Sequence, residues 1–240
     1  MNTNKMQVEI WSDVMCPFCY IGKRHFETAL EQFANNREVE IIWKSFQLDP
    51  ALPEKEEIDH EQYLVERKGL PKDQVKSLLD HVTQSARQAG LDYRFDKVIT
   101  VNSFNAHRVI QMAKTKGWGD AAEERFFKAY FTEGLDIADR PTLTRLGKEI
   151  GLTEEDINEA LTNEAYAGKV NRDLYEAQQI GVRGVPFFVF NRKYAVSGAQ
   201  PPEAFTQTLD KAFAEWRQEH PLPSLEITEG PSCTPDGHCS

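Results

Sequence analysis

A Cys-x-x-Cys motif lies where an apolar strand pattern gives way to a helical one. The motif is Cys16-Pro17-Phe18-Cys19, and residues 6–11 before it alternate between apolar and polar side chains. Pro17 suits the first helical position, because it has no N–H to leave unpaired and its φ is already helical. Cys19 then lies one turn beyond Cys16 on the same face. The sequence therefore predicts a strand, a turn and a helix that hold two sulfurs within disulfide reach.

A thiol at the start of a helix is favoured as a thiolate, because the unpaired N–H groups and the positive end of the helix dipole attract an anion. We expect Cys16 to be the more exposed sulfur and the attacking thiolate, and Cys19 to be the resolving thiol. The alternatives are half of a zinc site and a pair of core cysteines. The strand-to-helix setting and the intervening proline favour a redox pair over zinc, which usually needs a second Cys pair on Gly-rich turns. We expect no metal.

The elements on either side of the motif predict an α/β fold that a helical segment divides. Residues 1–47 read as a βαβ unit with a parallel strand pair, since the crossover is long enough for one helix. Residues 48–164 show almost only helical periodicity and are expected to form a helical insertion domain closed by its own apolar faces. Residues 165–219 read as a helix, a hairpin and a last helix, which complete the first domain with residues 1–47. Residues 220–240 form a Pro-, Gly- and Ser-rich irregular tail.

Composition excludes several classes of partner. The net charge is −10, and the Lys and Arg residues form no dense cluster, so we expect no nucleic acid partner. No apolar run approaches the roughly 18 residues of a membrane span, so we expect no membrane association. The first residues are polar and show no secretory signal, which predicts a cytoplasmic protein. In that compartment a Cys-x-x-Cys motif is more often catalytic than a structural staple.

The order of these elements resembles the thioredoxin fold, and the helical segment makes the chain similar to the DsbA-like branch. The match is closer to the FrnE-like group of dithiol oxidoreductases and isomerases. The resemblance is carried by the Cys-x-x-Cys motif and by three further segments, residues 102–108 (NSFNAHR), 134–139 (GLDIAD) and 181–190 (GVRGVPFFVF). It implies a thioredoxin-like fold with a large helical insertion.

The resemblance also implies a cis peptide bond between Val185 and Pro186, lying against the disulfide. Such a bond would present the backbone N–H and C=O of Val185 to an extended substrate. An ordinary trans proline at a strand start is the alternative. Pro17 and Phe18, together with His107, are weaker candidates for a substrate groove.

Two further cysteines, Cys233 and Cys239, lie in the tail, and FrnE-like proteins carry a similar C-terminal pair. The turn sequence between them could bring their sulfurs together. An accessory redox pair that exchanges with Cys16 and Cys19 is one interpretation. A local staple of the tail and a metal site are the others.

The predicted function is thiol-disulfide exchange by Cys16 and Cys19 on protein or small disulfide substrates, without a cofactor, with a thiol reductant or oxidant to recycle the pair. A glutathione-dependent kappa-type transferase or isomerase and a non-catalytic thioredoxin-like binding module are the alternatives. Asp13 could relay protons to Cys19 or cap the turn. Because Phe18 brings no cation to the motif, we expect a less oxidising pair than one with histidine there.

Overall fold

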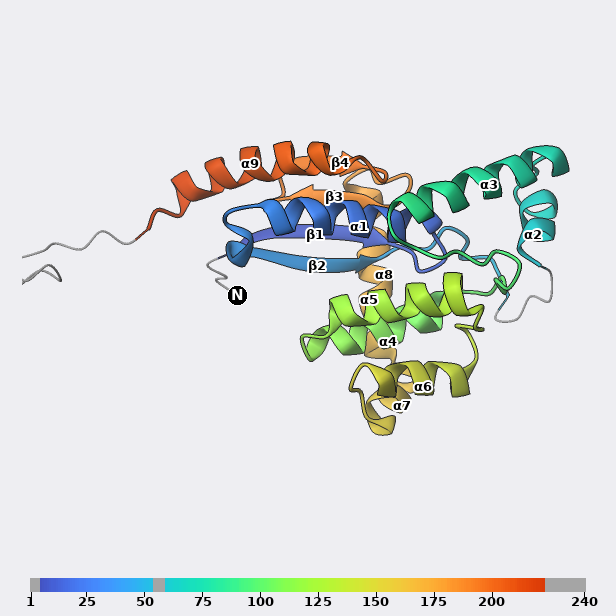
Figure 1. Ribbon diagram of the computed structural model, residues 1–240. Helices are drawn as coiled ribbons and strands as arrows, with labels where there is room; N and C mark the ends of the chain where they lie inside the picture. Colours follow the sequence, from blue (N-terminus) through green and yellow to red (C-terminus); the bar gives the residue numbers. More distant parts are fainter. Residues whose placement is uncertain (1–4, 54–58, 223–240) are drawn as a thin grey trace, which may run out of the picture.

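The computed structural model describes residues 5–53 and 59–222, which form a four-stranded sheet with helices on both faces (Figure 1). The strand order is β2-β1-β3-β4. The strands are β1 (Met6–Ser12), β2 (Val39–Ser45), β3 (Phe187–Phe190) and β4 (Tyr194–Ser197). β1 pairs in parallel with β2 and antiparallel with β3, and β3 pairs antiparallel with β4. The predicted parallel pair, the hairpin and the α/β fold class are confirmed.

One face of the sheet is covered by α1 (Pro17–Gln32) and α9 (Pro202–Glu219), which lie side by side (Figure 1). Alternate residues of β1 point into this layer and are fully buried there, namely Met6, Val8 and Ile10. Phe26 of α1 packs in the same layer with its ring centroid 5.5 Å from that of Phe188. The regular alternation of the strand therefore fixes which face of β1 carries α1, and with it the position of the motif.

The remaining helices are α2 (His60–Glu66), α3 (Lys72–Gln88), α4 (Phe104–Thr115), α5 (Gly119–Lys128), α6 (Arg140–Glu149), α7 (Glu154–Thr162) and α8 (Glu164–Gln179). Local capping side chains fix the starts of two of them. The Asp59 side chain accepts from the Gln62 N–H, and Thr153 forms a capping box with Asp156. Within the described ranges, none of these helices is long and apolar enough to cross a bilayer.

The end of α5 departs from regular α-helical geometry. A π-helical turn, Ala129–Glu133, follows α5, and Gly134 ends it with φ at 66°. A Cβ at that glycine would lie 2.5 Å from the Lys97 backbone oxygen. The close approach of the Lys97 loop and the left-handed backbone together require glycine there.

The expectation that the helical segment closes its own core is wrong. Cys16, Cys19 and Tyr20 belong to the same apolar cluster as side chains of α3 to α7. The Tyr20 ring stacks on Phe127 of α5 with centroids 4.9 Å apart. The first turns of α1 pack against the helical segment, whereas Phe26 and Ala29 further along α1 pack on the sheet. The division of the chain at residues 47 and 165 stays a prediction.

Candidate active site

The motif occupies the start of α1. Cys16 is the N-cap residue, with extended backbone at φ −89° and ψ 111°, and Pro17 takes the first helical position. The Cys16 N–H donates to the Asp13 carbonyl at 2.8 Å, and the Cys19 N–H donates to the Cys16 carbonyl at 3.0 Å. Cys16 is 3% exposed and Cys19 1% exposed. Cys16 is therefore the more exposed of the two, as expected, but both residues are buried.

Cys19 lies in surroundings that keep its proton. Burial raises the pKa of the Cys19 thiol well above its ordinary value, and the neighbouring Cys16 thiol raises it further. The backbone N–H of Asp13 and the hydroxyl of Ser12 act in the opposite direction without reversing the shift. A resolving cysteine has to stay protonated while its partner reacts, and the buried Cys19 thiol beside Cys16 meets this condition.

The loop before β3 contacts the outer sulfur. The Val185–Pro186 peptide bond is cis, in the isomer that the resemblance implies. The Cys16 thiol donates to the Val185 carbonyl across 3.4 Å. The loop is anchored at its other end, where the Gly198 N–H donates to the Pro186 carbonyl at 2.8 Å. These contacts bring Cys16 together with the two residues that the sequence assigned to substrate binding.

Gly22, one turn beyond Cys19 on α1, makes this arrangement possible. A Cβ at Gly22 would lie 2.9 Å from Pro186 Cγ and 3.5 Å from Ala199 Cβ. The helix therefore packs against the proline loop with no room for a side chain. The sequence did not reveal this role of Gly22, because the partner loop lies far along the chain.

Asp13 is a fully buried carboxylate that ties the motif loop to its surroundings. Its Oδ1 accepts from the Met15 N–H at 3.2 Å, and its Oδ2 accepts from the Leu48 N–H at 2.8 Å. Its Oδ1 also lies 3.4 Å from His107 Nε2. These contacts show the capping that the sequence suggested for Asp13. Of the two roles considered, they support a structural one.

His107 does not line a substrate groove, and the prediction that it does so is wrong. The residue is 0% exposed on α4, and its ring faces the Asp13 carboxylate rather than solvent. Burial alone would lower the pKa of His107, but the hydrogen bond and the charge of Asp13 outweigh it and raise that pKa. His107 is instead the partner of the buried Asp13 carboxylate. Pro17 and Phe18 do line a groove.

Two further buried residues gave no sequence signal. The Tyr93 hydroxyl donates to the Pro17 carbonyl at 2.6 Å, although Tyr93 belongs to an irregular loop after α3. Glu123 of α5 is 1% exposed, and its Oε2 has no hydrogen-bond partner. Burial raises the pKa of Glu123 to about 7. Only the tertiary structure shows that Tyr93 contacts the motif and that Glu123 is buried where the charge of His107 acts on it.

The tail pair, Cys233 and Cys239, lies outside the described residues. Within the described part of the chain, no three His, Cys, Asp or Glu side chains are grouped as metal ligands would be.

Comparisons with known proteins identify the family. Residues 7–210 match the model of the DSBA-like thioredoxin domain. The chain belongs to this family of thiol-disulfide oxidoreductases, and its fold is the DsbA-like thioredoxin fold with a helical insertion.

Individual relatives agree with this assignment. A probable DsbA oxidoreductase from Streptomyces coelicolor is 36% identical, with a TM-score of 0.83 and 98% of each chain covered. The uncharacterized protein YwbO of Bacillus subtilis is 25% identical over 209 residues, which are 85% of this chain and 96% of YwbO. The cytosolic disulfide reductase DsbM of Pseudomonas aeruginosa, solved with GSH, is 18% identical, with a TM-score of 0.61 and coverage of 87% and 99%. At that identity the similarity to DsbM concerns the fold alone.

Proposed function

We propose that Cys16 and Cys19 form the redox pair of a disulfide oxidoreductase or isomerase that acts on protein or peptide substrates. The observation that carries the proposal is the position of Cys16. Its sulfur lies at the N-cap of α1, with no acidic residue in the first helical turn, and it contacts the Val185 carbonyl. Unpaired N–H groups at a helix start favour negative charge on such a sulfur. Cys19 supplies the buried second thiol within one turn.

In the reductive direction, the Cys16 thiolate attacks one sulfur of a substrate disulfide. The substrate S–S bond breaks, a mixed disulfide forms, and the second substrate sulfur leaves as a thiolate that takes a proton from solvent. Cys19 then loses its proton and attacks the Cys16 sulfur. The Cys16–Cys19 bond forms, the substrate leaves as a dithiol, and two electrons have passed from the protein to the substrate. The reverse sequence oxidises a dithiol.

Isomerisation uses the same first step. A second thiol of the substrate attacks the mixed disulfide and releases Cys16, so the protein is neither oxidised nor reduced. The backbone of Val185 offers an extended substrate a hydrogen-bonding edge beside the sulfur, and Pro186 limits access from that side. Which direction dominates depends on the reduction potential of the pair.

Recycling after substrate reduction needs a thiol reductant. Glutathione is one thiol to test in this role, because DsbM, a protein of similar fold, was solved with GSH. Cys233 and Cys239 stay a proposed accessory pair. Unchanged rates in a Cys233→Ser/Cys239→Ser double variant would remove them from the mechanism.

Reduction of a peptide disulfide by dithiothreitol, with the protein as catalyst, tests the proposal. We expect Cys16→Ser to abolish catalysis, because no attacking sulfur remains at the N-cap. When dithiothreitol is left out, Cys19→Ser should accumulate a mixed disulfide at Cys16 that mass spectrometry of tryptic peptides locates, because no thiol resolves it. The tail double variant is measured beside these single variants, and it shows what loss of thiols outside the motif does to the rate. Full turnover in Cys16→Ser would refute the proposed function.

A further inference from the structure

The hydroxyl of Ser12 is buried and unpaired beside the motif. Ser12 is the last residue of β1 and is 0% exposed. Among the residues that the structure describes, its Oγ has no hydrogen-bond partner, and both cysteines of the motif are free thiols. A buried hydroxyl without a partner lowers stability, so its presence indicates a role outside this reduced resting state.

Ser12 lies on the face of β1 that carries α1. Alternate residues of β1 point into the layer of α1 and α9, and Ser12 continues this alternation two residues beyond Ile10. Its hydroxyl is therefore turned toward α1 at the end of the strand, where the short loop of residues 13–15 leads into the motif. The hydroxyl lowers the pKa of the Cys19 thiol, which is the effect of a donor close to that sulfur.

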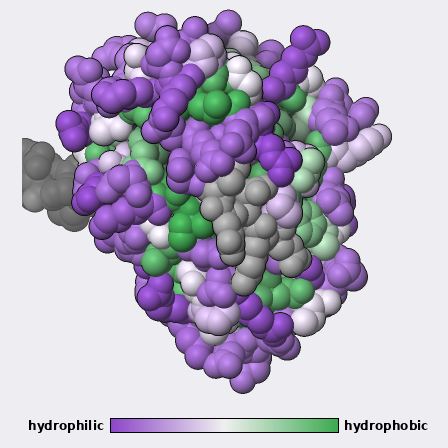
Figure 2. Space-filling model, turned by 90° about the vertical axis from the view of Figure 1, so that its right-hand side faces the viewer, coloured by the Kyte–Doolittle hydropathy of each residue, from purple (hydrophilic) through white to green (hydrophobic). Residues whose placement is uncertain are grey.

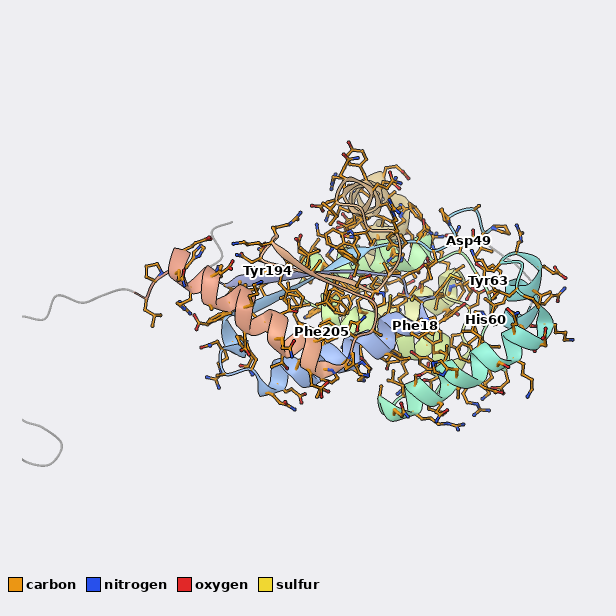
Figure 3. The ribbon with its side chains drawn as sticks, turned by 90° about the horizontal axis from the view of Figure 1, so that it is seen from above. Phe18, Asp49, His60, Tyr63, Tyr194 and Phe205 are labelled. Carbon is orange, nitrogen blue, oxygen red and sulfur yellow. The ribbon has the colours of Figure 1, made fainter. Side chains whose placement is uncertain are left out.

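The motif has an outer side and an inner side. Phe18 lies at the start of α1 toward α2 and α3 (Figure 3), and it is 39% exposed. On that side of the molecule most surface side chains are polar, with apolar groups among them (Figure 2). Cys19, the next residue, is 1% exposed. A negative charge on the Cys19 sulfur must therefore be stabilised by groups of the protein rather than by solvent.

Two donors act on the Cys19 sulfur. The backbone N–H of Asp13 is one and the hydroxyl of Ser12 is the other, and both lower the pKa of Cys19. A protonated thiol is a weak acceptor, whereas a thiolate forms a stronger, charge-assisted hydrogen bond. The hydroxyl hydrogen of Ser12 rotates about the C–O bond, so it can turn to the sulfur when charge develops there. The bond is therefore worth most at the moment when Cys19 reacts.

We propose that Ser12 is a catalytic residue of the resolving step, in which its hydroxyl donates to the Cys19 sulfur as that sulfur becomes a thiolate. The inference rests on the proposed function and deepens it. In this step the proton of Cys19 passes to solvent, and the thiolate attacks the Cys16 sulfur of the mixed disulfide. The Cys16–Cys19 bond forms, the bond from Cys16 to the substrate breaks, and the departing sulfur takes up a proton. A donor that strengthens only as charge develops on Cys19 speeds this step and leaves the first attack by Cys16 unchanged.

Single-turnover kinetics separate the two steps. The parent protein is the full chain with Cys233→Ser and Cys239→Ser, which leaves only the thiols of the motif. It is reduced, mixed with a short peptide disulfide and quenched with acid at intervals, and mass spectrometry follows the mixed disulfide at Cys16 and its conversion to the Cys16–Cys19 disulfide. With Ser12→Ala we expect the mixed disulfide to form at the parent rate and to be resolved roughly tenfold to a hundredfold more slowly.

Stability distinguishes a catalytic hydroxyl from a structural one. Ser12→Ala removes a hydroxyl that has no partner in the described part of the chain, so the unfolding free energy of the reduced protein in urea should stay at the parent value or rise. Ser45→Ala is the matched control, at the residue of β2 that pairs with Ser12. The Ser45 hydroxyl is also buried, but it accepts from Gln111 Nε2 at 3.0 Å. Its removal should lower the unfolding free energy and leave the rate of resolution unchanged.

The two steps also separate this inference from the function on which it rests. If the parent protein forms neither the mixed disulfide nor the Cys16–Cys19 disulfide, the proposed redox function fails. If the parent resolves the mixed disulfide and Ser12→Ala does so at the same rate, the role of Ser12 is overturned and the redox function stands. Equal slowing of both steps in Ser12→Ala, or a loss of unfolding free energy as large as that of Ser45→Ala, would also overturn the role of Ser12.

Discussion

Burial of Glu123 should make the free energy of unfolding depend on pH, and the substitution Glu123→Gln should remove that dependence. Glu123 of α5 is 1% exposed, and its Oε2 has no hydrogen-bond partner. Burial raises the pKa of Glu123 to about 7, although the charges of His107, Lys114 and Lys23 lower it and that of Asp120 raises it. Glu123→Gln keeps the size of the side chain and removes the titration.

The sign and the size of the effect follow from linkage. The folded-state pKa is about 7 and the ordinary pKa of an exposed glutamate is 4.5, so the folded state holds the proton more tightly. This contribution to stability is fully present below pH 4.5 and is lost as the pH rises through about 7. A shift of about 2.5 units at about 1.4 kcal/mol each gives a loss of about 3 kcal/mol between pH 4.5 and pH 8.

Urea unfolding of wild type and Glu123→Gln at pH 4.5 and pH 8 measures this loss. Between pH 4.5 and pH 8, wild type should lose about 3 kcal/mol of unfolding free energy relative to Glu123→Gln. Glu31→Gln, at an exposed position of α1, is the control and should show no such change. A Glu123→Gln curve parallel to wild type across this range would refute the reasoning.

Two further substitutions test how the motif is held. Asp13→Asn removes the charge that faces buried His107 and one acceptor for the backbone N–H groups of Met15 and Leu48, so unfolding free energy should fall by about 3 kcal/mol in urea titrations. Because Asp13 raises the pKa of His107, the charge pairing is present below about pH 6.5 and is lost as the pH rises through the folded-state pKa. The destabilisation caused by Asp13→Asn should therefore be larger at pH 6 than at pH 9. Equal values at the two pH values would contradict the pairing. Gly22→Ala should push Pro186 away and cost about 1–3 kcal/mol with a matching loss of peptide reduction, whereas Gly184→Ala, where a Cβ meets nothing within 4 Å, is the control. An unaffected Gly22→Ala protein would show that the contact is unimportant.

Local rules explain why most of the fold was predictable. The alternation in β1 and the helical stripe of α1 set the βαβ unit, and short-range caps such as Asp59 and Thr153 set helix starts. The position of the motif at the first turn of α1 follows from Pro17 alone. These signals act over a few residues, so they can be read without knowledge of the tertiary contacts.

The features that the sequence did not predict depend on contacts between distant segments. Tyr93 reaches the Pro17 carbonyl from an irregular loop, where no periodicity indicates burial. His107 was a candidate for the groove, but its partner is Asp13, 94 residues earlier. The shared core of the motif and the helical segment has the same origin, since an apolar stripe shows that a face is buried and not what covers it.

The redox pair itself is tested most directly by equilibration of the protein with reduced and oxidised glutathione, in a variant that lacks Cys233 and Cys239. Mass spectrometry of the peptide that contains the motif then gives the fraction of Cys16–Cys19 disulfide at each ratio. We predict a two-electron transition to that disulfide, at a potential clearly below the roughly −120 mV of a strong oxidant, because Phe18 brings no cation to the motif. Separate thiols at every ratio would contradict the redox pair, and a midpoint near that oxidising value would contradict the role assigned to Phe18.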